Sequence, residues 1–402
     1  MDFNLDETQE ELRALAAGLL DRETTPARRQ EHERSGAPYD EGLWRSLARA
    51  GLLGAVLPEE AGGAGLGPVE LAVVLREIGA RVAPVPVQQS LVAAMAVARY
   101  GDAGQRRELA PLAEGELVLS AAPRGPGGAP GRSPAGERAG SSRVTAREGG
   151  GGWLLDGRTT AVPYAAQSAR VLVPAETAGG PGLFLVEPAP AVLRPVPLPS
   201  GEPGAVLVLD GTPARPVGDP GGPAGEEAVR GLGRLATAAS AAVVSGVLAG
   251  ALELTCGYLR TRRQFGRALA EFQAVTMQIA DVYIASRALD VTVRSAVWRL
   301  AGHPGGGSGA FPGAIPGGGP DAFPGGETGR DAAGEADTDL AVAAFTAAGP
   351  ALEALYACQH LHGGIGLDVT YPLHRHFAWG RHHAQLLGGA ELQLDTIGAL
   401  AG

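Results

Sequence analysis

The sequence predicts an α+β protein in three parts: an N-terminal all-α domain over residues 1–115, a small β-barrel or β-sandwich domain over 116–213, and a C-terminal four-helix bundle over 225–402. Apolar residues recur with helical period before residue 115 and after residue 225, whereas short β-type runs separated by Gly and Pro lie between them. With 402 residues, of which 45% are hydrophobic, the chain is long enough to bury more than one core.

The N-terminal domain is expected to begin with an amphipathic helix from Asp6 to about Glu23. Asp6 is a candidate N-cap, and Gln9 occupies the capping-box position three residues later. The apolar side of this helix is formed by Leu12, Leu15, Ala16, Leu19 and Leu20. Further helices are predicted over about 40–53, 68–82 and 85–113, with a turn over 57–63.

The middle domain is predicted from five short runs rich in Leu and Val, at 117–119, 153–155, 169–173, 183–186 and 205–209. Asp156-Gly157 is a hairpin-type dipeptide after the second run. Residues 123–142 are rich in Gly, Pro and Ser, so we expect a flexible loop that interrupts this domain.

The bundle is predicted from helical segments at about 226–260, 268–301, 336–362 and 380–400. Residues 235–254 are nearly all apolar, but they are rich in Ala, Gly and Ser and contain Glu253, which favours a buried helix over a membrane span. Residues 303–334 consist largely of Gly and Pro with scattered Ala and Phe, which predicts a disordered insertion.

The charge composition excludes several function classes. The net charge is −10, so nucleic acid and anionic membrane are poor partners. All 33 cationic residues are Arg, which excludes Schiff-base chemistry and the phosphate-loop lysine.

Cys256 and Cys358 lie far apart in apolar surroundings, and acidic Asp2 and Asp6 follow Met1 in place of a signal peptide. We therefore expect a cytoplasmic protein without a disulfide framework.

Three motifs in order give the chain its resemblance to a family. They are Leu57-Pro58-Glu59-Glu60-Ala61-Gly62-Gly63; Arg262-Arg263-Gln264-Phe265-Gly266 followed by Phe272-Gln273; and His362-Gly363-Gly364-Ile365-Gly366 followed by Tyr371-Pro372-Leu373-His374-Arg375. Over almost its whole length the chain resembles the acyl-CoA dehydrogenase flavoproteins. The resemblance implies FAD as cofactor, an acyl-CoA substrate, a homo- or heterotetramer, and an acceptor of the electron-transfer flavoprotein type.

The second and third motifs are suited to binding a dinucleotide. Arg262 is a permanent cation that can pair bidentately with a pyrophosphate. Gly363-Gly364 leaves room for a ligand to approach the backbone. The resemblance implies that these residues contact FAD across a subunit interface, together with Gln264, Phe265, Gln273 and His360. Without the resemblance, a local ion pair of Arg262 and a helix C-cap at Gly363 remain open.

The catalytic carboxylate that the resemblance requires is absent from its usual places. A base must remove the α-proton of the thioester while a hydride passes to the flavin. The family's base position is Leu387, and its alternative position is Ala236. Glu391, one helical turn after Leu387, is a weak substitute.

Two flavin-side segments of the family are also altered. They are Ala121-Ala122-Pro123 and Ala161-Val162-Pro163. These departures favour a base-lacking subunit of a heteromeric acyl-CoA dehydrogenase. A self-sufficient homotetramer that uses Glu391 and a structural partner that binds no flavin are the alternatives.

Six of the eight histidines lie between His360 and His383, but their spacing does not favour a metal site. His360/His362 and His374/His376 are i,i+2 pairs, which point apart on a helix. Solvated or phosphate-adjacent histidines are the expectation instead. The identity of the acyl group stays open between linear, branched, polycyclic and carrier-bound chains, although small residues at Gly388-Gly389 and Ala236 hint at a branched or polycyclic one.

Overall fold

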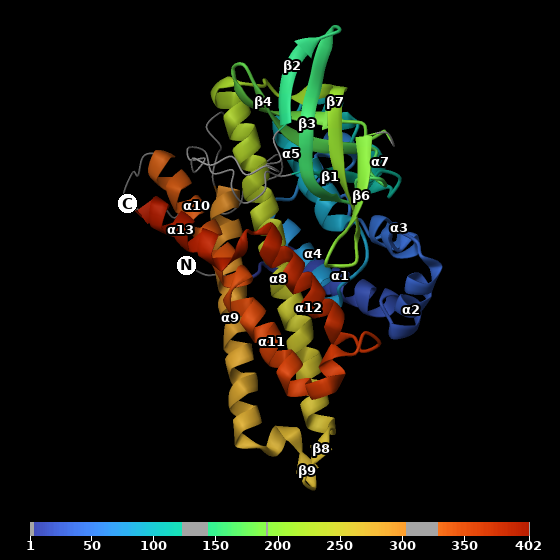
Figure 1. Cartoon of the computed structure of the whole chain (residues 1–402), viewed down its shortest axis with the longest axis vertical. Helices are drawn as coiled ribbons and strands as arrows, with labels where there is room; N and C mark the ends of the chain where they lie inside the picture. The colour runs from blue at the N-terminus through green and yellow to red at the C-terminus, as the bar shows by residue number, and fades with distance from the viewer. Residues whose placement is uncertain (1–3, 123–143, 190–191, 303–328, 402) are drawn as a thin grey trace.

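The computed structural model describes residues 4–122, 144–189, 192–302 and 329–401, with side chains from residue 334 in the last range. The molecule is elongated. A β-domain lies at one end of the long axis, and a small hairpin lies at the opposite end (Figure 1). The predicted flexible loop at 123–142 and residues 303–328 of the predicted insertion lie outside the described residues.

The N-terminal part is helical, with elements α1 (Glu7–Glu23), α2 (Pro26–Ser35), α3 (Glu41–Arg49), η1 (Glu59–Ala61), α4 (Pro68–Arg81), α5 (Val87–Tyr100), α6 (Ala103–Arg107) and α7 (Ala110–Ala113). The capping box is present: Asp6 Oδ1 accepts from the Gln9 amide at 2.8 Å, and Gln9 Oε1 accepts from the Asp6 amide at 3.1 Å. The single helix predicted over 85–113 is wrong, because α5 ends at Tyr100 with Gly101 as its C-cap, and Asp102 caps a new helix.

The middle part is a closed sheet of strands β1 (Leu119–Ala121), β2 (Val144–Gly149), β3 (Gly152–Pro163), β4 (Arg170–Thr177), β5 (Gly180–Val186), β6 (Leu193–Pro197) and β7 (Pro203–Val217). The order is β1-β4-β2-β3-β7-β5, and β5 returns to pair with β4. This return pairing closes a ring of five strands, as in a barrel, around a core that includes Leu155, Val173 and Phe184. β6 extends the sheet by pairing with β7.

The C-terminal part contains α8 (Gly222–Thr261), β8 (Arg263–Gln264), β9 (Arg267–Ala268), η3 (Leu269–Glu271), α9 (Gln273–Gly302), α10 (Gly329–Ala348), α11 (Pro350–His362), η4 (Gly363–Leu367), α12 (Leu373–Leu386) and α13 (Gly389–Ala401).

Three boundaries in this part differ from the prediction. The segment at 336–362 is two helices, because Pro350 cannot continue a helix and starts α11 at its N1 position. The segment at 380–400 is divided at Gly388, which has a φ of 86°. Helix α10 begins at Gly329, so the end of the predicted disordered insertion is helical.

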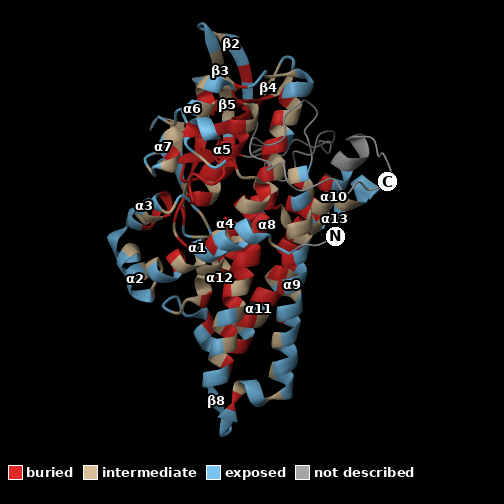
Figure 2. Cartoon of the chain, turned by 180° about the vertical axis from the view of Figure 1, so that it is seen from behind, coloured by how far each residue is buried: buried red, intermediate tan, exposed pale blue. Residues whose placement is uncertain are grey.

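Helix α8 forms the centre of the molecule. It packs against α4 from the N-terminal part and against α9, α11 and α12 of the bundle (Figure 1). The α4 and α8 backbones touch, since a Cβ added to Gly246 would lie 1.9 Å from the Arg76 carbonyl oxygen. The core is therefore continuous between the two helical parts, as the buried band along α8 shows (Figure 2).

Two stretches, Gly222–Thr261 and Gly334–Leu367, are long and apolar enough to cross a membrane. In the first, 78% of the most apolar window is buried inside the protein, and in the second 56%. Burial of this extent is typical of core helices, which pass the same test of length and composition.

Candidate functional site

The tip of the bundle is an exposed hairpin that follows α8. Arg262 caps α8 with extended backbone, and its amide donates to the Tyr258 carbonyl at 2.8 Å. Gln264 pairs with Arg267 across the hairpin, and Phe265 and Gly266 form its turn with φ of 49° and 81°. Left-handed backbone is unusual for a residue as bulky as Phe, and here it presents a ring that is 94% exposed. The Phe265 ring thus lies mostly in solvent, with the Phe272 ring edge-on to it at 6.4 Å between centroids.

Gly363-Gly364 lies at the same end of the bundle. Gly363 has a φ of 64° and a ψ of −143°, which only glycine adopts readily, and its amide donates to the His360 carbonyl. A Cβ added to Gly363 or Gly364 would meet nothing within 4 Å. The backbone at this turn is therefore open to a ligand or to another chain.

A stack of aromatic side chains joins the two motifs. The Tyr258 ring stacks on the His362 imidazole at 4.5 Å between centroids, and Tyr258 Oη donates to the His362 carbonyl at 3.3 Å. His362 Nδ1 donates to the Cys358 carbonyl at 2.8 Å, so Nε2 accepts from the Tyr371 hydroxyl at 3.2 Å. Burial lowers the pKa of His362, which favours this neutral form. The stack fixes the end of α8, with Arg262, against the turn that carries Gly363.

The remaining predicted cofactor residues occupy the same end of the molecule. Gln273 is exposed at the first position of α9, and His360 is exposed in the last turn of α11. The residues that fix the site, Tyr258, His362 and Tyr371, were not singled out from the sequence as positioning residues. Their signal was spacing, since Tyr258 lies one turn before Arg262 and His362 directly precedes Gly363.

The family's base positions hold apolar side chains inside the protein. Leu387 is 4% exposed in the core, where its amide donates to the His383 carbonyl. Ala236 is half-buried in α8 and packs on the same core. Glu391 is exposed on α13. The buried carboxylates among the described residues are Glu77, Glu202 and Asp290, and none belongs to a base position.

The two altered flavin-side segments are largely buried in their described residues. Ala121 and Ala122 at the end of β1 are 6% and 5% exposed, and Val162 near the end of β3 is fully buried. Tyr164, directly after β3, is also fully buried. Pro123 lies outside the described residues. The described part of this edge therefore presents no exposed hydroxyl or amide side chain to a flavin.

The prediction that the clustered histidines are solvated or phosphate-adjacent is wrong for the buried ones, which are His362, His376, His382 and His383. The two ring nitrogens of His376 lie 3.3 and 3.2 Å from the carbonyl oxygens of Pro372 and Ala80. Burial lowers the pKa of His376 to about 4, and the neutral ring donates to one of these two carbonyls. These imidazoles are packed groups of the helix core. Across the described residues, no group of three or more His, Cys, Asp or Glu could hold a metal ion.

The donors at the bundle tip fit the phosphates of FAD. An exposed guanidinium at Arg262, an exposed amide at Gln264 and the open backbone at Gly363-Gly364 offer charge and hydrogen bonds to an anion. The buried edge at β1 and β3 offers no comparable exposed donors to the flavin ring in its described residues. The chain thus has a donor set suited to one side of a dinucleotide.

Comparison with known proteins decides the family. The acyl-CoA dehydrogenase N-terminal domain model matches residues 6–116, and the C-terminal domain model matches residues 231–310. The acyl-CoA dehydrogenase FadE27 of Mycobacterium tuberculosis is 34% identical over 99% of this chain and 98% of the relative. The chain belongs to the acyl-CoA dehydrogenase family. It is therefore an oxidoreductase of a flavin-dependent family that acts on the CH–CH bond of an acyl-CoA.

Two solved structures resemble this acyl-CoA dehydrogenase over nearly its full length. A Tcur3481-Tcur3483 steroid ACAD variant has a TM-score of 0.82 and 37% identity, and covers 98% of both chains. The ChsE4-ChsE5 complex from Mycobacterium tuberculosis has a TM-score of 0.82 and 31% identity, covering 99% of this chain and 98% of the other. The names of both structures combine two components, Tcur3481 with Tcur3483 and ChsE4 with ChsE5. They support the predicted family and its heteromeric type.

Proposed function

We propose that this acyl-CoA dehydrogenase chain is a subunit without its own catalytic carboxylate, paired with a paralogous subunit in an FAD-dependent tetramer. The observation that carries the proposal is the contrast between the donors suited to FAD and the position of the catalytic base. The donors at Arg262, Gln264 and Gly363-Gly364 are exposed, whereas the base position at Leu387 is apolar and buried.

The bound FAD would accept the hydride from the β-carbon of the acyl thioester. Arg262 would pair with the FAD pyrophosphate, and the exposed Phe265 ring would contact the cofactor. Because removal of the α-proton needs a carboxylate within hydrogen-bond reach, that group would come from the partner subunit. An acceptor of the electron-transfer flavoprotein type would then reoxidise the flavin.

An exposed apolar stripe on α9 supports assembly with another chain. Met277, Ile284, Val291 and Trp298 are spaced by seven residues and therefore share one side of the helix. They are 62%, 63%, 46% and 51% exposed. A row of exposed apolar side chains of this kind is typical of a surface that another subunit covers.

The proposed substrate is an acyl-CoA with a polycyclic acyl group. The similar Tcur3481-Tcur3483 structure is described as a steroid ACAD. In this chain, Gly388-Gly389 directly follow the base position Leu387, and the alternative base position is the small residue Ala236. A comparison of turnover between steroid-side-chain and octanoyl-CoA substrates tests this point, and faster turnover of the octanoyl thioester would reject it.

The test of the pairing is the visible spectrum and native mass of this chain, purified alone and after co-expression with a neighbouring dehydrogenase-like gene product. We expect flavin absorbance and a heteromeric mass in the co-expressed sample. Arg262→Gln should lower the flavin content of that complex about tenfold, since a charge-assisted pair is lost. The control Arg230→Gln, which removes surface ion pairs with Glu226 and Glu227, should leave it unchanged. A chain that retains flavin alone would reject the pairing.

A further inference from the structure

The exposed hairpin at the tip of the bundle (Figure 1) has two sides that carry different side chains. Residues paired across a hairpin project on the same side, and successive residues of a strand project on opposite sides. Gln264 pairs with Arg267, whereas Arg263 pairs with Ala268. Arg262 has extended backbone and lies two residues before Gln264. Arg262, Gln264 and Arg267 therefore share one side, which we call the Gln264 face, and Arg263 lies on the other.

Arg267 is held on this face by an aromatic ring. Its guanidinium carbon lies 4.2 Å from the centroid of the Phe272 ring, and the Phe265 ring lies edge-on to the same ring. A guanidinium over an aromatic face keeps its charge, and its N–H donors remain available for hydrogen bonds. Because Arg267 is exposed, an anion in solvent can reach these donors.

Phe272 also connects this face to the start of α9. Gln273, the next residue, is the first of the 30 residues of this helix, and the first turn of α9 contains no acidic residue. The first amides of a helix have no partner within the helix and carry partial positive charge. The Gln264 face and the start of α9 thus present two guanidinium groups and amide donors at one end of the molecule.

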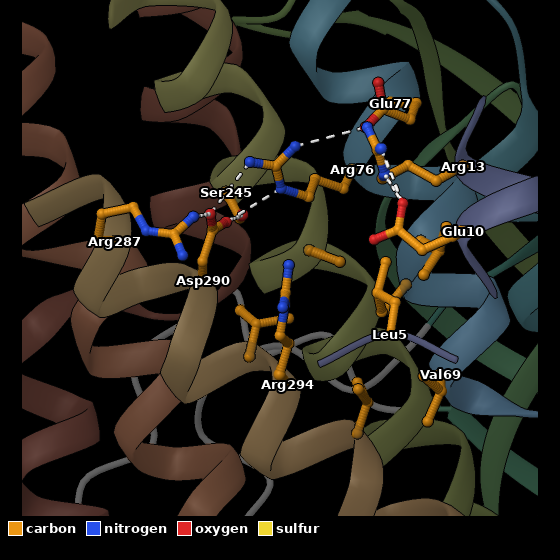
Figure 3. Close-up of a pocket in the computed structure, with 15 residues that line it drawn as sticks. Leu5, Glu10, Arg13, Val69, Arg76, Glu77, Ser245, Arg287, Asp290 and Arg294 are labelled. Atoms are coloured by element: carbon orange, nitrogen blue, oxygen red, sulfur yellow. Dashed lines mark hydrogen bonds and ion pairs between the residues drawn. The ribbon is translucent and has the colours of Figure 1, made fainter. Parts of the chain in front are cut away.

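The arginines of the Gln264 face differ from those inside the protein. A cavity of about 240 Å³ between α1, α4, α8 and α9 is lined by charged side chains (Figure 3). There Arg13 pairs with Glu10 at 2.8 Å. Arg76 and Arg287 pair with Asp290 at 3.0 and 3.3 Å. These three arginines are therefore already bound by carboxylates of the chain.

The hairpin arginines have no such partners. Among the residues that the structure describes, no carboxylate forms an ion pair with Arg262, Arg263 or Arg267. The carboxylate nearest to the hairpin along the chain is Glu271, and its Oε1 accepts from the Ala268 amide at 3.1 Å. Exposed guanidinium groups without a counter-ion attract an anion, and two of them on one face match a group with two negative charges. The Gln264 face therefore fits a pyrophosphate.

We propose that Arg267 is a second cation for the FAD pyrophosphate, acting with Arg262, and that its contact with Phe272 holds it in place before the cofactor binds. This inference rests on the proposed function and adds to it a binding residue, Arg267, and a positioning residue, Phe272. Guanidinium groups pair bidentately with phosphate oxygens, and a side chain that is already held loses less conformational entropy on binding. Coenzyme A also contains a pyrophosphate, so it is the competing ligand in the test.

The test is a titration of the co-expressed complex, freed of flavin, with FAD and separately with coenzyme A, in which FAD binding is followed by the change in flavin fluorescence. Arg267→Gln should weaken FAD binding about tenfold, since one charge-assisted pair is lost. Phe272→Leu should weaken it about threefold, because Arg267 keeps its charge but loses the ring that holds it. The matched control Arg263→Gln removes the same charge from the other side of the hairpin and should leave FAD binding within about twofold.

Arg267→Lys is a second variant at the same position. It keeps the charge without the planar fork, so it should bind FAD more tightly than Arg267→Gln does. Unchanged FAD binding by Arg267→Gln would overturn the proposal, and so would an equal loss in Arg263→Gln, which would reflect net charge alone. A loss of coenzyme A binding with FAD binding unchanged would assign Arg267 to the substrate and overturn it too.

Two results separate this inference from the function on which it rests. If Arg262→Gln weakened FAD binding and Arg267→Gln did not, the inference would fail and the proposed function would stand. A wild-type complex that takes up no FAD would reject both.

Discussion

Replacing Asp290 with Asn removes the buried charge that holds α4, α8 and α9 together. The Asp290 carboxylate is 2% exposed and accepts from Arg76, Arg287 and Ser245. Removal of one partner of a buried pair costs about 3–5 kcal/mol, because the other charge is left without its counter-ion. Arg76 is 28% exposed and keeps its partner Glu77. We therefore expect Asp290→Asn to lower the free energy of unfolding by about 3 kcal/mol, near the lower limit of this range.

Urea unfolding with an unchanged m-value measures this loss. The control Arg45→Gln breaks an exposed pair with Glu41 and should cost less than about 1 kcal/mol. The double variant Arg76→Leu with Asp290→Leu should be more stable than Asp290→Asn, since it removes the buried guanidinium together with its carboxylate. Glu77 keeps Arg81 in this variant, and Arg287, which loses Asp290, is 53% exposed to water. A loss for Asp290→Asn no larger than that of Arg45→Gln would refute the reasoning.

The same pair gives a pH dependence. Burial by itself raises the pKa of Asp290, but the hydrogen bonds and charges of Arg76, Ser245 and Arg287 outweigh it and hold the pKa below its usual value. The stabilisation is therefore complete above the unfolded pKa of about 3.9 and is lost as pH falls through the lower folded value. The stability difference between wild type and Asp290→Asn should shrink only on acidification below about pH 4.

The remaining predictions concern the base, a second buried carboxyl and the subunit contact. Glu391→Gln should leave acyl-CoA turnover of the complex within about twofold, because Glu391 is exposed on α13; a loss of about a hundredfold or more would make it the base. Burial raises the pKa of Glu202 from 4.5 to about 7. The free energy of unfolding of the wild type, measured in urea, should therefore fall relative to that of Glu202→Gln as the pH rises from 4.5 to about 7. Parallel pH profiles of the two proteins would contradict this. Trp298→Asp should lower the native mass measured by light scattering, since it places a charge on the exposed apolar stripe of α9. An unchanged native mass would show that this stripe is not part of the subunit interface.

Local signals in the sequence predicted much of the fold. The Asp6–Gln9 capping box starts α1, and α4 begins at Pro68, where the apolar pattern of a helix begins. Such elements are specified by neighbouring residues, so they are visible without tertiary information. Helix α2 was missed because it buries no residue and begins only with a Thr25 cap and Pro26.

Long-range packing accounts for what the sequence did not predict. The burial of His376 depends on the Ala80 carbonyl, 296 residues away in the chain. The stack of Tyr258 on His362 joins segments 104 residues apart, and the cavity beside Asp290 needs four helices to form. The candidate site residues were identified by motif, and their location at one end of the bundle follows from these tertiary contacts.

The measurement that tests the central claim most directly is anaerobic bleaching of the flavin by an acyl-CoA substrate, recorded for this chain alone and for its complex with the paralogous subunit. With Leu387 and Ala236 at the base positions, we predict bleaching in the complex and none with this chain alone, even after reconstitution with excess FAD. Stoichiometric bleaching by the isolated chain would contradict the account, because it would require a base that this chain supplies itself.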